Sequence, residues 1–198
     1  MAPTASVNAS CRAAVGRAVL ACVLLILGGV ARAEALLGRV VGVTDGDTVT
    51  VLDAAKVQHK IRLAGIDAPE KGQPFGERSK ENLSRLVFGR DVRVDWRKTD
   101  RYGRLVGTVW VASPEASCGR KADCPKTLDA AMAQLTVGLA WHYKKYANEQ
   151  EPQQRGQYAF AEEEARAKRA GLWKDPNPVP PWDWRGAMRS SNGNPPRG

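Results

Sequence analysis

The sequence predicts an α+β domain that is mainly a small closed barrel of five β-strands, with about three helices. Five segments alternate apolar and polar residues, a period of two that is typical of half-buried strands. Three other segments space their apolar residues at the intervals of a helix face. The 198 residues, 43% of them hydrophobic, suit a single globular domain that can bury a core.

Residues 1–33 are expected to be a signal peptide and not part of this domain. Arg12 and Arg17 give a basic start, residues 18–31 form an apolar run that is short for a membrane-spanning helix, and an A-x-A cleavage sequence closes it. We therefore expect a mature chain that begins near Glu34, is exported to the periplasm or secreted, and has no stable membrane association. A retained membrane anchor is the alternative.

The first part of the domain is predicted to contain three strands and a helix. Alternation predicts the strands at residues 39–43, 48–54 and 57–66. The Asp45–Gly46 step predicts a turn between the first two strands. In residues 76–89 the apolar side chains fall on one face and Gly89 supplies a stop, which predicts a helix.

Two more strands and two more helices are predicted after residue 90, the strands at 91–96 and 104–111 and the helices at 127–140 and 158–171. These elements complete a domain over residues 34–175. The Pro/Gly-rich tail that follows, residues 176–198, is predicted to be extended chain. We expect Trp182 and Trp184 of this tail to pack back onto the domain.

A net positive charge points to a polyanionic partner. The chain carries 30 Lys and Arg against 21 Asp and Glu, a formal charge of +9. The predicted signal peptide holds three of the arginines and no acid, so the mature chain keeps 27 basic residues and a charge of +6. Nucleic acid or an acidic surface suits this charge, although excess lysine can also serve solubility alone. No HExxH, GxSxG, P-loop or Cys/His motif competes for the chemistry.

Cys118 and Cys124 are predicted to form a disulfide in the exported domain. The other two cysteines, Cys11 and Cys22, lie in the predicted signal peptide. Cysteines of exported proteins meet an oxidising environment, which favours pairing. Half of a zinc site is the weaker alternative, because five residues separate the two cysteines and the mature chain has no second Cys/His pair.

Acidic and basic side chains gather in three motifs, DGDTV, IRLAGIDAPE and TDRYGR. The candidates that these motifs supply for a metal and phosphate site are Asp45, Asp47, Arg62, Asp67, Glu70 and Arg104. Strand parity turns Asp47 and Asp67 toward the apolar face, where a carboxylate is costly without a partner. A calcium ion, which takes about six to eight oxygen ligands, is one such partner. An Asx turn and structural ion pairs with the arginines are the alternatives for each residue taken alone.

Phosphodiester hydrolysis explains why these residue types occur together. A metal polarises a phosphate oxygen, a carboxylate orients or deprotonates the attacking water, and guanidinium groups neutralise the charge that develops. Arginine suits the last role because its planar fork grips phosphate oxygens in pairs. Strict alternation puts Arg62 and Asp67 on opposite faces, so the chain must bend between them, and Gly65 permits that bend.

Together and in this order, the three motifs resemble the staphylococcal (micrococcal) nuclease family, also called thermonucleases. The resemblance spans about residues 36–174 and implies an OB-type barrel. The roles that it implies are calcium binding by Asp47, Asp67 and the backbone carbonyl of Ala68, action on water by Glu70, and phosphate binding by Arg62 and Arg104. It also implies that Asp45 lies just behind the metal; turn chemistry alone is the alternative for this residue.

Four positions near these motifs concern ligand contacts. Ala68 stands where the family pattern has threonine, which keeps the backbone carbonyl and loses a hydroxyl contact. Tyr102 matches the family pattern of a phosphate or nucleotide contact, and packing within the turn is the alternative. Tyr143 and Tyr146 are both candidates for stacking on bases, and the sequence does not separate them.

We therefore expect an exported calcium-dependent nuclease that hydrolyses phosphodiester bonds in DNA, RNA or both, as a monomeric endonuclease with little sequence preference. The family likeness implies release of the 5′-oxygen and 3′-phosphate ends. The alternative is a non-catalytic OB-fold module that binds nucleic acid or protein. Such modules commonly lose the acids or arginines of the site. This chain keeps all five of them, namely Asp47, Arg62, Asp67, Glu70 and Arg104.

Overall fold

The computed structural model describes residues 34–118 and 123–192, and the predicted signal peptide at 1–33 lies outside them. Over these described ranges, no helix has the length and apolar character needed to cross a bilayer.

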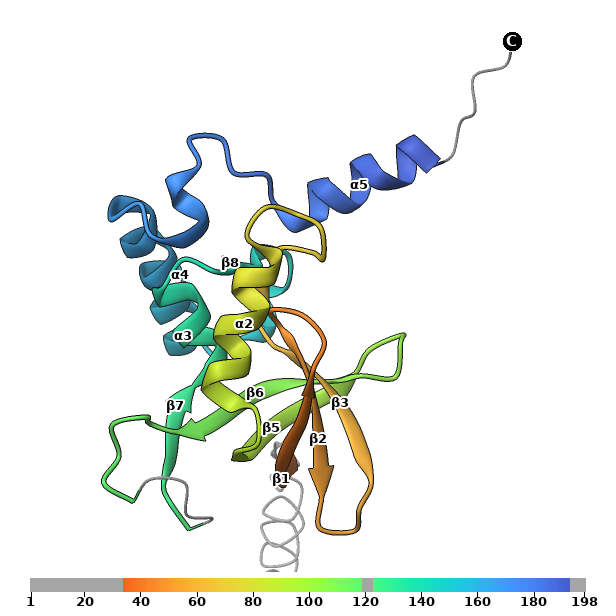
Figure 1. The fold of residues 1–198 in the computed structure, drawn as a ribbon, viewed down its shortest axis with the longest axis vertical. Helices are drawn as coiled ribbons and strands as arrows, with labels where there is room; N and C mark the ends of the chain where they lie inside the picture. The colour runs from red at the N-terminus through yellow and green to blue at the C-terminus, as the bar shows by residue number, and fades with distance from the viewer. Residues whose placement is uncertain (1–33, 119–122, 193–198) are drawn as a thin grey trace, which may run out of the picture. The chain divides into compact units, whose positions relative to one another are not determined.

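Five strands close into a mixed barrel (Figure 1). They are β1 (Glu34–Val43), β2 (Thr48–Asp53), β3 (Gln58–Leu63), β5 (Asp91–Thr99) and β6 (Leu105–Ala112). Antiparallel pairing runs from β3 through β2, β1 and β5 to β6, and parallel pairing of β3 with β6 closes the circle. The predicted five-stranded, OB-type barrel is confirmed, and only β1 begins well ahead of its expected start.

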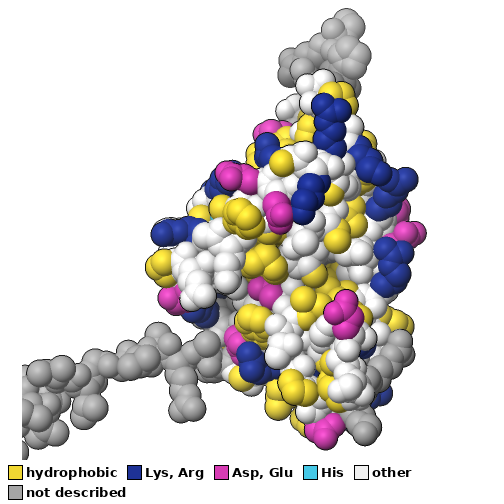
Figure 2. Space-filling model, turned by 90° about the vertical axis from the view of Figure 1, so that its left-hand side faces the viewer, with side chains coloured by type: hydrophobic (Ala, Val, Ile, Leu, Met, Phe, Trp, Pro, Cys, Tyr) yellow, Lys and Arg dark blue, Asp and Glu magenta, His cyan; other side chains and the backbone are white. Residues whose placement is uncertain are grey.

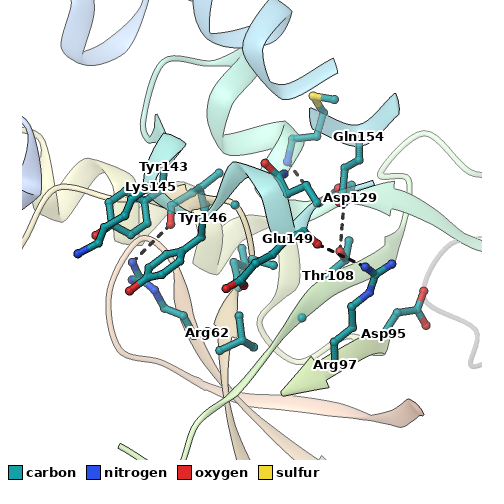
Figure 3. A pocket seen from close by; sticks show the side chains of 18 of the residues that line it. Arg62, Asp95, Arg97, Thr108, Asp129, Tyr143, Lys145, Tyr146, Glu149 and Gln154 are labelled. Carbon is teal, nitrogen blue, oxygen red and sulfur yellow. Dashed lines mark hydrogen bonds between the residues drawn. The ribbon is translucent and has the colours of Figure 1, made fainter. Parts of the chain in front are cut away.

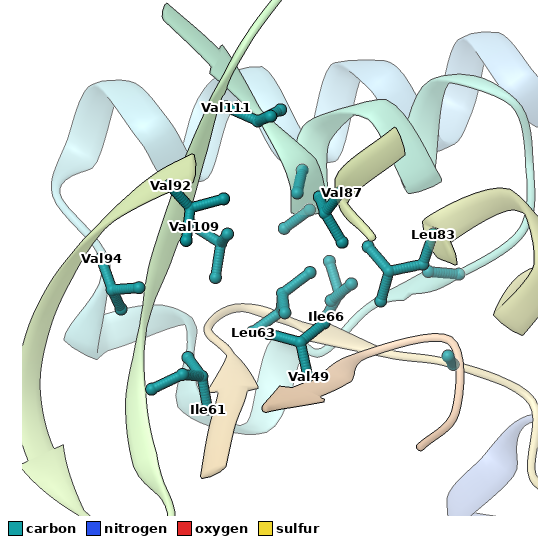
Figure 4. Close-up of a cluster of buried hydrophobic side chains, with 14 of the residues drawn as sticks. Val49, Ile61, Leu63, Ile66, Leu83, Val87, Val92, Val94, Val109 and Val111 are labelled. Atoms are coloured by element: carbon teal, nitrogen blue, oxygen red, sulfur yellow. The ribbon is translucent and has the colours of Figure 1, made fainter. Parts of the chain in front are cut away.

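The barrel encloses a core of β-branched and leucine side chains (Figure 4). Val49 of β2, Ile61 of β3, Val94 of β5 and Val109 of β6 are fully buried together, and Leu83 of a helix covers the end of this cluster. Burying each such side chain stabilises the fold by about 1.5–3 kcal/mol. The barrel is therefore a firm frame for side chains at the ends of its strands.

Three helices pack against the barrel, α2 (Gly76–Val87), α3 (Ala130–Thr136) and α4 (Pro152–Ala167). The first agrees with the prediction. α3 is shorter than predicted because Lys126–Asp129 pair with β6 as strand β7, and the Asp129 carboxylate caps the helix by accepting from the N–H of Ala131. α4 begins earlier than predicted, at Pro152, since proline is tolerated in a first helical turn.

Four short elements complete the domain, namely β4 (Ile66–Asp67), β8 (Trp141–His142) and two 3₁₀ helices at Lys144–Glu149 and Gly171–Lys174. β4 and β8 pair antiparallel, with Asp67 opposite Trp141. The predicted disulfide is confirmed, because Cys118 and Cys124 are bonded in the connection between β6 and β7.

The C-terminal segment differs from the prediction. Pro181–Asn192 form helix α5 and not extended chain. Proline has no N–H and a fixed φ, so the same residue that breaks a helix interior can start a helix, as Pro181 does. Trp182 packs back as expected, with its ring centroid 5.7 Å from that of Trp141.

Candidate active site

The DGD turn places Asp47 at the buried start of β2. Asp45 Oδ1 accepts the N–H of Asp47 at 3.1 Å, which is an Asx turn. A Cβ on Gly46 would collide with Ser79 Oγ of α2 and with the side chain of Ala68, so only glycine lets the helix approach this turn. The structure thus gives Asp45 the role of orienting the chain that carries Asp47.

Arg62 joins two buried aspartates. Its guanidinium forms an ion pair with Asp47 Oδ1 and a second with Asp67 Oδ1, the latter at 2.7 Å. Between Arg62 and Asp67 the chain turns at Gly65, whose φ of 75° lies in the left-handed region that favours glycine. The predicted bend at Gly65 is confirmed, and it brings Arg62 and Asp67 together.

The backbone of Ala68 links the two aspartates further. Its N–H donates to Asp47 Oδ2 at 2.7 Å, and the exposed fractions of Asp47 and Asp67 are 1% and 0%. Ionised carboxylates at such depth are costly unless a cation pairs with them. Arg62 is a cation that both aspartates share, so the two side chains converge on one place, Asp47 from the turn before β2 and Asp67 from β4.

Glu70 lies beside these aspartates, and the three residues Asp47, Asp67 and Glu70 are called the acid cluster below. Arg185 of α5, which the sequence analysis missed, donates to Glu70 Oε1 at 2.5 Å and to Asp67 Oδ2 at 2.7 Å. The bond to Asp67 is the main cause that raises the pKa of Arg185 above its ordinary value, and Glu70 adds to it. The only sequence signal was an arginine directly after the tryptophans of the tail.

Arg104 lines the same cleft but pairs with a different carboxylate. Its Nε and one terminal nitrogen donate to Asp100 Oδ2 at 2.8 and 2.7 Å, and its guanidinium lies 5.3 Å from the ring centroid of Tyr102. Partial burial by itself would raise the pKa of Asp100, but hydrogen bonds from the backbone and side chain of Arg104 outweigh it and hold this pKa below its ordinary value. Asp100 therefore stays ionised and fixes the orientation of Arg104.

The two tyrosines that the sequence did not separate have different surroundings (Figure 3). Their ring centroids lie 5.4 Å apart. Tyr143 is stacked on Trp182 at 5.5 Å with an interplanar angle of 25°, so one of its faces is covered. Tyr146 is 45% exposed and Lys98 Nζ lies 5.0 Å from its ring centroid. Tyr146 thus exposes more of its ring to solvent, while one face of the Tyr143 ring is packed against Trp182.

Several of the site residues line one open cleft of about 1740 Å³, and the buried Asp47 and Asp67 lie behind its lining. The site residues that line it include Arg62, Glu70, Tyr102, Arg104, Tyr143, Tyr146 and Arg185. Drug-sized ligands occupy sites of roughly 300–1,000 Å³, so the cleft suits a longer ligand. On the face drawn in Figure 2, lysine and arginine side chains are interspersed with acidic ones and do not form an unbroken patch.

The chemistry of the acid cluster fits a hard divalent cation. Asp47 and Asp67 already converge on a positive charge, that of Arg62, and both present carboxylate oxygens, the ligand type that calcium takes. Among the residues that the structure describes, no three His, Cys, Asp or Glu side chains are arranged as metal ligands. The two aspartates would therefore need backbone, water or ligand oxygens to complete a coordination sphere.

A family model described as "Staphylococcal nuclease homologue" matches residues 60–175, more than half of the chain. The chain belongs to the staphylococcal nuclease homologue family. The motif resemblance is thereby confirmed. The matched range contains Arg62, Asp67, Glu70 and Arg104, whereas Asp47 precedes it and the whole of α5 follows it.

Several relatives of this staphylococcal nuclease homologue are similar over most of its length. "Protein ParB" of Escherichia coli is 45% identical over 89% of this chain and 92% of its own length. "Micrococcal nuclease" of Shigella flexneri is 41% identical over 88% and 94%. "Staphylococcal-like nuclease CAN1" of Arabidopsis thaliana is 38% identical over 67% of this chain and 35% of its own length.

Proposed function

We propose that this protein is an exported, calcium-dependent nuclease that hydrolyses phosphodiester bonds in DNA, RNA or both. The observation that carries the proposal is the convergence of Arg62 on the buried Asp47 and Asp67, at a place where Arg62 and Glu70 line an open cleft. Relatives that are named nucleases support the same reaction class. Export rests on the signal peptide predicted at residues 1–33.

The residues of the cleft divide the chemistry among them. Calcium held by Asp47, Asp67 and the backbone carbonyl of Ala68 would polarise a phosphate oxygen. Glu70 accepts a proton from water while the water oxygen bonds to phosphorus. The bond from phosphorus to the 5′-oxygen breaks, that oxygen takes a proton from solvent, and a 3′-phosphate end remains.

Two arginines stabilise the charge that builds up on the phosphate. In this structure Arg62 is held by the two aspartates and Arg104 by Asp100, so each guanidinium is positioned before a substrate arrives. Base contacts are limited to stacking on exposed rings such as that of Tyr146. Contacts of this type are tolerant of sequence, which supports endonucleolytic cleavage with little base preference.

The test is to incubate the purified protein with single- and double-stranded DNA and RNA in calcium, in magnesium or with chelator. We expect cleavage in calcium and little in magnesium, because an open oxygen site of two aspartates suits calcium better than the tight octahedron of magnesium. Cleavage that continues in excess chelator contradicts the metal dependence. If the wild type binds nucleic acid without cleaving it, the protein is a non-catalytic OB-fold module and not an enzyme.

A variant pair separates catalysis from binding. Glu70→Gln is nearly isosteric, and we expect it to bind a labelled oligonucleotide in calcium while it cuts the strand about 10²- to 10³-fold more slowly. Glu77→Gln, at an exposed position in the first turn of α2, removes the same charge and serves as the control. Equal rates for Glu70→Gln and Glu77→Gln would show that Glu70 has no catalytic role.

A further inference from the structure

Two residues after the matched family range are connected to Glu70, Arg185 directly through its side chain and Val179 through Gln73. Glu70 lies on the loop between β4 and α2, where its N–H donates to Gln73 Oε1 at 2.9 Å and its carbonyl accepts the N–H of Gln73 at 3.0 Å. Gln73 Nε2 in turn donates to the carbonyl of Val179 at 2.7 Å. Arg185 then binds the Glu70 carboxylate at 2.5 Å. Two independent connections therefore run from this loop to the C-terminal segment.

The C-terminal segment is packed against the same loop and strand pair. Trp182 contacts the rings of Trp141 and Tyr143, and Trp141 is the residue opposite Asp67 in the β4–β8 pair. Val179 and Trp184 line a cavity of only about 50 Å³ together with residues of the Glu70 loop. Figure 1 shows the loop after β4 beside the first turn of α5. The helix is thus docked on the active site by apolar contacts, which leaves Arg185 free to act on the carboxylates.

Arg185 fixes the distance between two members of the acid cluster. One nitrogen of its fork binds Asp67 Oδ2 at 2.7 Å, and the other lies 3.2 Å from Asp67 Oδ1 and 2.5 Å from Glu70 Oε1. Glu70 needs such a partner, because its side chain is 37% exposed, has several rotatable bonds and sits on a loop. Catalytic groups must be held within a fraction of an ångström of their productive place.

We propose that α5 is part of the active site and that Arg185 is a positioning residue, which holds the Glu70 carboxylate beside Asp67 for its action on water. The inference rests on the proposed nuclease function. It differs from two other roles that an arginine in this cleft could have. A contact to substrate phosphate would act on substrate affinity, and a counter-ion that merely blocks the acid cluster would slow the enzyme.

The kinetic test compares Arg185→Gln and Arg185→Lys with the wild type in calcium. We expect Arg185→Gln to lower kcat by about 10- to 100-fold while KM changes less than about threefold, because the lost interaction orients a catalytic group. Arg185→Lys should recover part of the loss, since an ammonium can pair with one carboxylate but lacks the planar fork. Arg155→Gln on the exposed side of α4 removes the same charge and should retain the wild-type kcat.

A second measurement is independent of activity. Hydrogen exchange of the amides at residues 70–73 and 75, followed by mass spectrometry without substrate, should be faster in Arg185→Gln than in wild type. A rise in KM at constant kcat, a kcat equal to or above that of the wild type, or unchanged exchange would each overturn the inference.

A second variant covers the case in which Arg185→Gln does not fold. Gln73→Leu removes the side-chain bonds to the Val179 carbonyl and to the Glu70 N–H. The same loss of kcat and faster loop exchange are expected from it, and wild-type values for both would overturn the inference that the C-terminal segment positions Glu70. If the wild type itself cleaves no substrate, the proposed nuclease function fails, and the exchange data alone then decide whether Arg185 holds the loop.

Discussion

At the scale of single residues, the site depends on a charge balance between carboxylates and guanidinium groups. The acid cluster contributes three negative charges, and Arg62 and Arg185 contribute two positive ones. One negative charge in excess favours a further cation, which agrees with the proposed metal. Arg104 stays out of this balance because it pairs with Asp100 instead.

Gly46 lies at a position of the DGD turn that has no room for a side chain. We expect Gly46→Ala to lower the free energy of unfolding by about 1–3 kcal/mol, because its Cβ has no room beside Ser79 and Ala68 and the turn or α2 must move. The measurement is urea unfolding followed by circular dichroism.

Gly156 is the matched control for this substitution. It lies inside α4, where an added Cβ meets nothing within 4 Å. Alanine is favoured over glycine in a helix interior by about 0.5–1 kcal/mol, so Gly156→Ala should stabilise the protein. Equal effects of the two substitutions would mean that the close approach at Gly46 is not what limits that position.

At the scale of elements, Asp129 joins a strand and two helices. It ends β7, caps α3 through the N–H of Ala131 and accepts the hydroxyl of Tyr158 from α4 at 2.6 Å. Burial raises the pKa of the Asp129 carboxyl above its ordinary value, although the hydrogen bonds from Tyr158 and the helix N–H groups oppose this. Protonation of the Asp129 carboxyl therefore stabilises the folded state, in which β7, α3 and α4 meet at this residue.

This raised pKa gives a pH dependence of known sign. The folded state holds the Asp129 proton more tightly than the unfolded state, so the associated stability is fully present below about pH 4 and is lost as pH rises through the folded pKa. Asp129→Asn keeps an acceptor and does not titrate. We expect urea unfolding between about pH 4 and 8 to show wild type losing stability relative to Asp129→Asn as pH rises. If the free energies of unfolding of wild type and Asp129→Asn differ by the same amount at every pH, this prediction is wrong.

The disulfide belongs to the connection between β6 and β7 and not to the cleft. Cys118 and Cys124 are six residues apart, and a loop this short removes little chain entropy, which corresponds to about 2 kcal/mol. Among the described residues of the connection, none lines the cleft. Reduction should therefore lower the thermal midpoint and leave kcat close to its value in the oxidised protein; a large loss of kcat in folded, reduced protein would contradict this.

At the scale of the whole molecule, positive charge acts over longer distances than any one contact. The mature chain is predicted to carry +6, and its lysines and arginines are spread among acids on the face of Figure 2. A distributed charge of this kind steers a polyanion without fixing its register. We expect the few arginines and aromatic rings that line the cleft to set that register.

The salt dependence of oligonucleotide binding measures how much the positive charge of the protein contributes to affinity. We expect the logarithm of the binding constant of Glu70→Gln for a single-stranded oligonucleotide in calcium to fall linearly with the logarithm of the salt concentration, since each phosphate contact contributes a slope of about −0.7. Arg62 and Arg104 alone predict about −1.4, and surface charges make the slope steeper. Fluorescence anisotropy from about 50 to about 300 mM salt measures it. An affinity that is independent of salt would exclude phosphate as the main ligand group.

The sequence by itself determined the barrel, and its three motifs supplied the candidate site residues. Strand alternation is a local pattern that burial imposes on each strand separately, so β2, β3, β5 and β6 were found close to their true limits. The buried aspartates were found for the same reason, because parity alone assigns Asp47 and Asp67 to the apolar face. The bend between Arg62 and Asp67 followed from the presence of Gly65.

Only the tertiary structure decided which of these residues meet. The cover of Tyr143 by Trp182 and the helical form of α5 depend on how separate segments pack, and no local pattern carries that information. Arg185 is the clearest case, since it lies 118 residues from Asp67 in the chain and in contact with it in the fold. From its sequence a proline-rich segment is predicted to be extended. It forms a helix here because packing on an apolar surface such as that of Trp141 supplies the stability that short isolated helices lack.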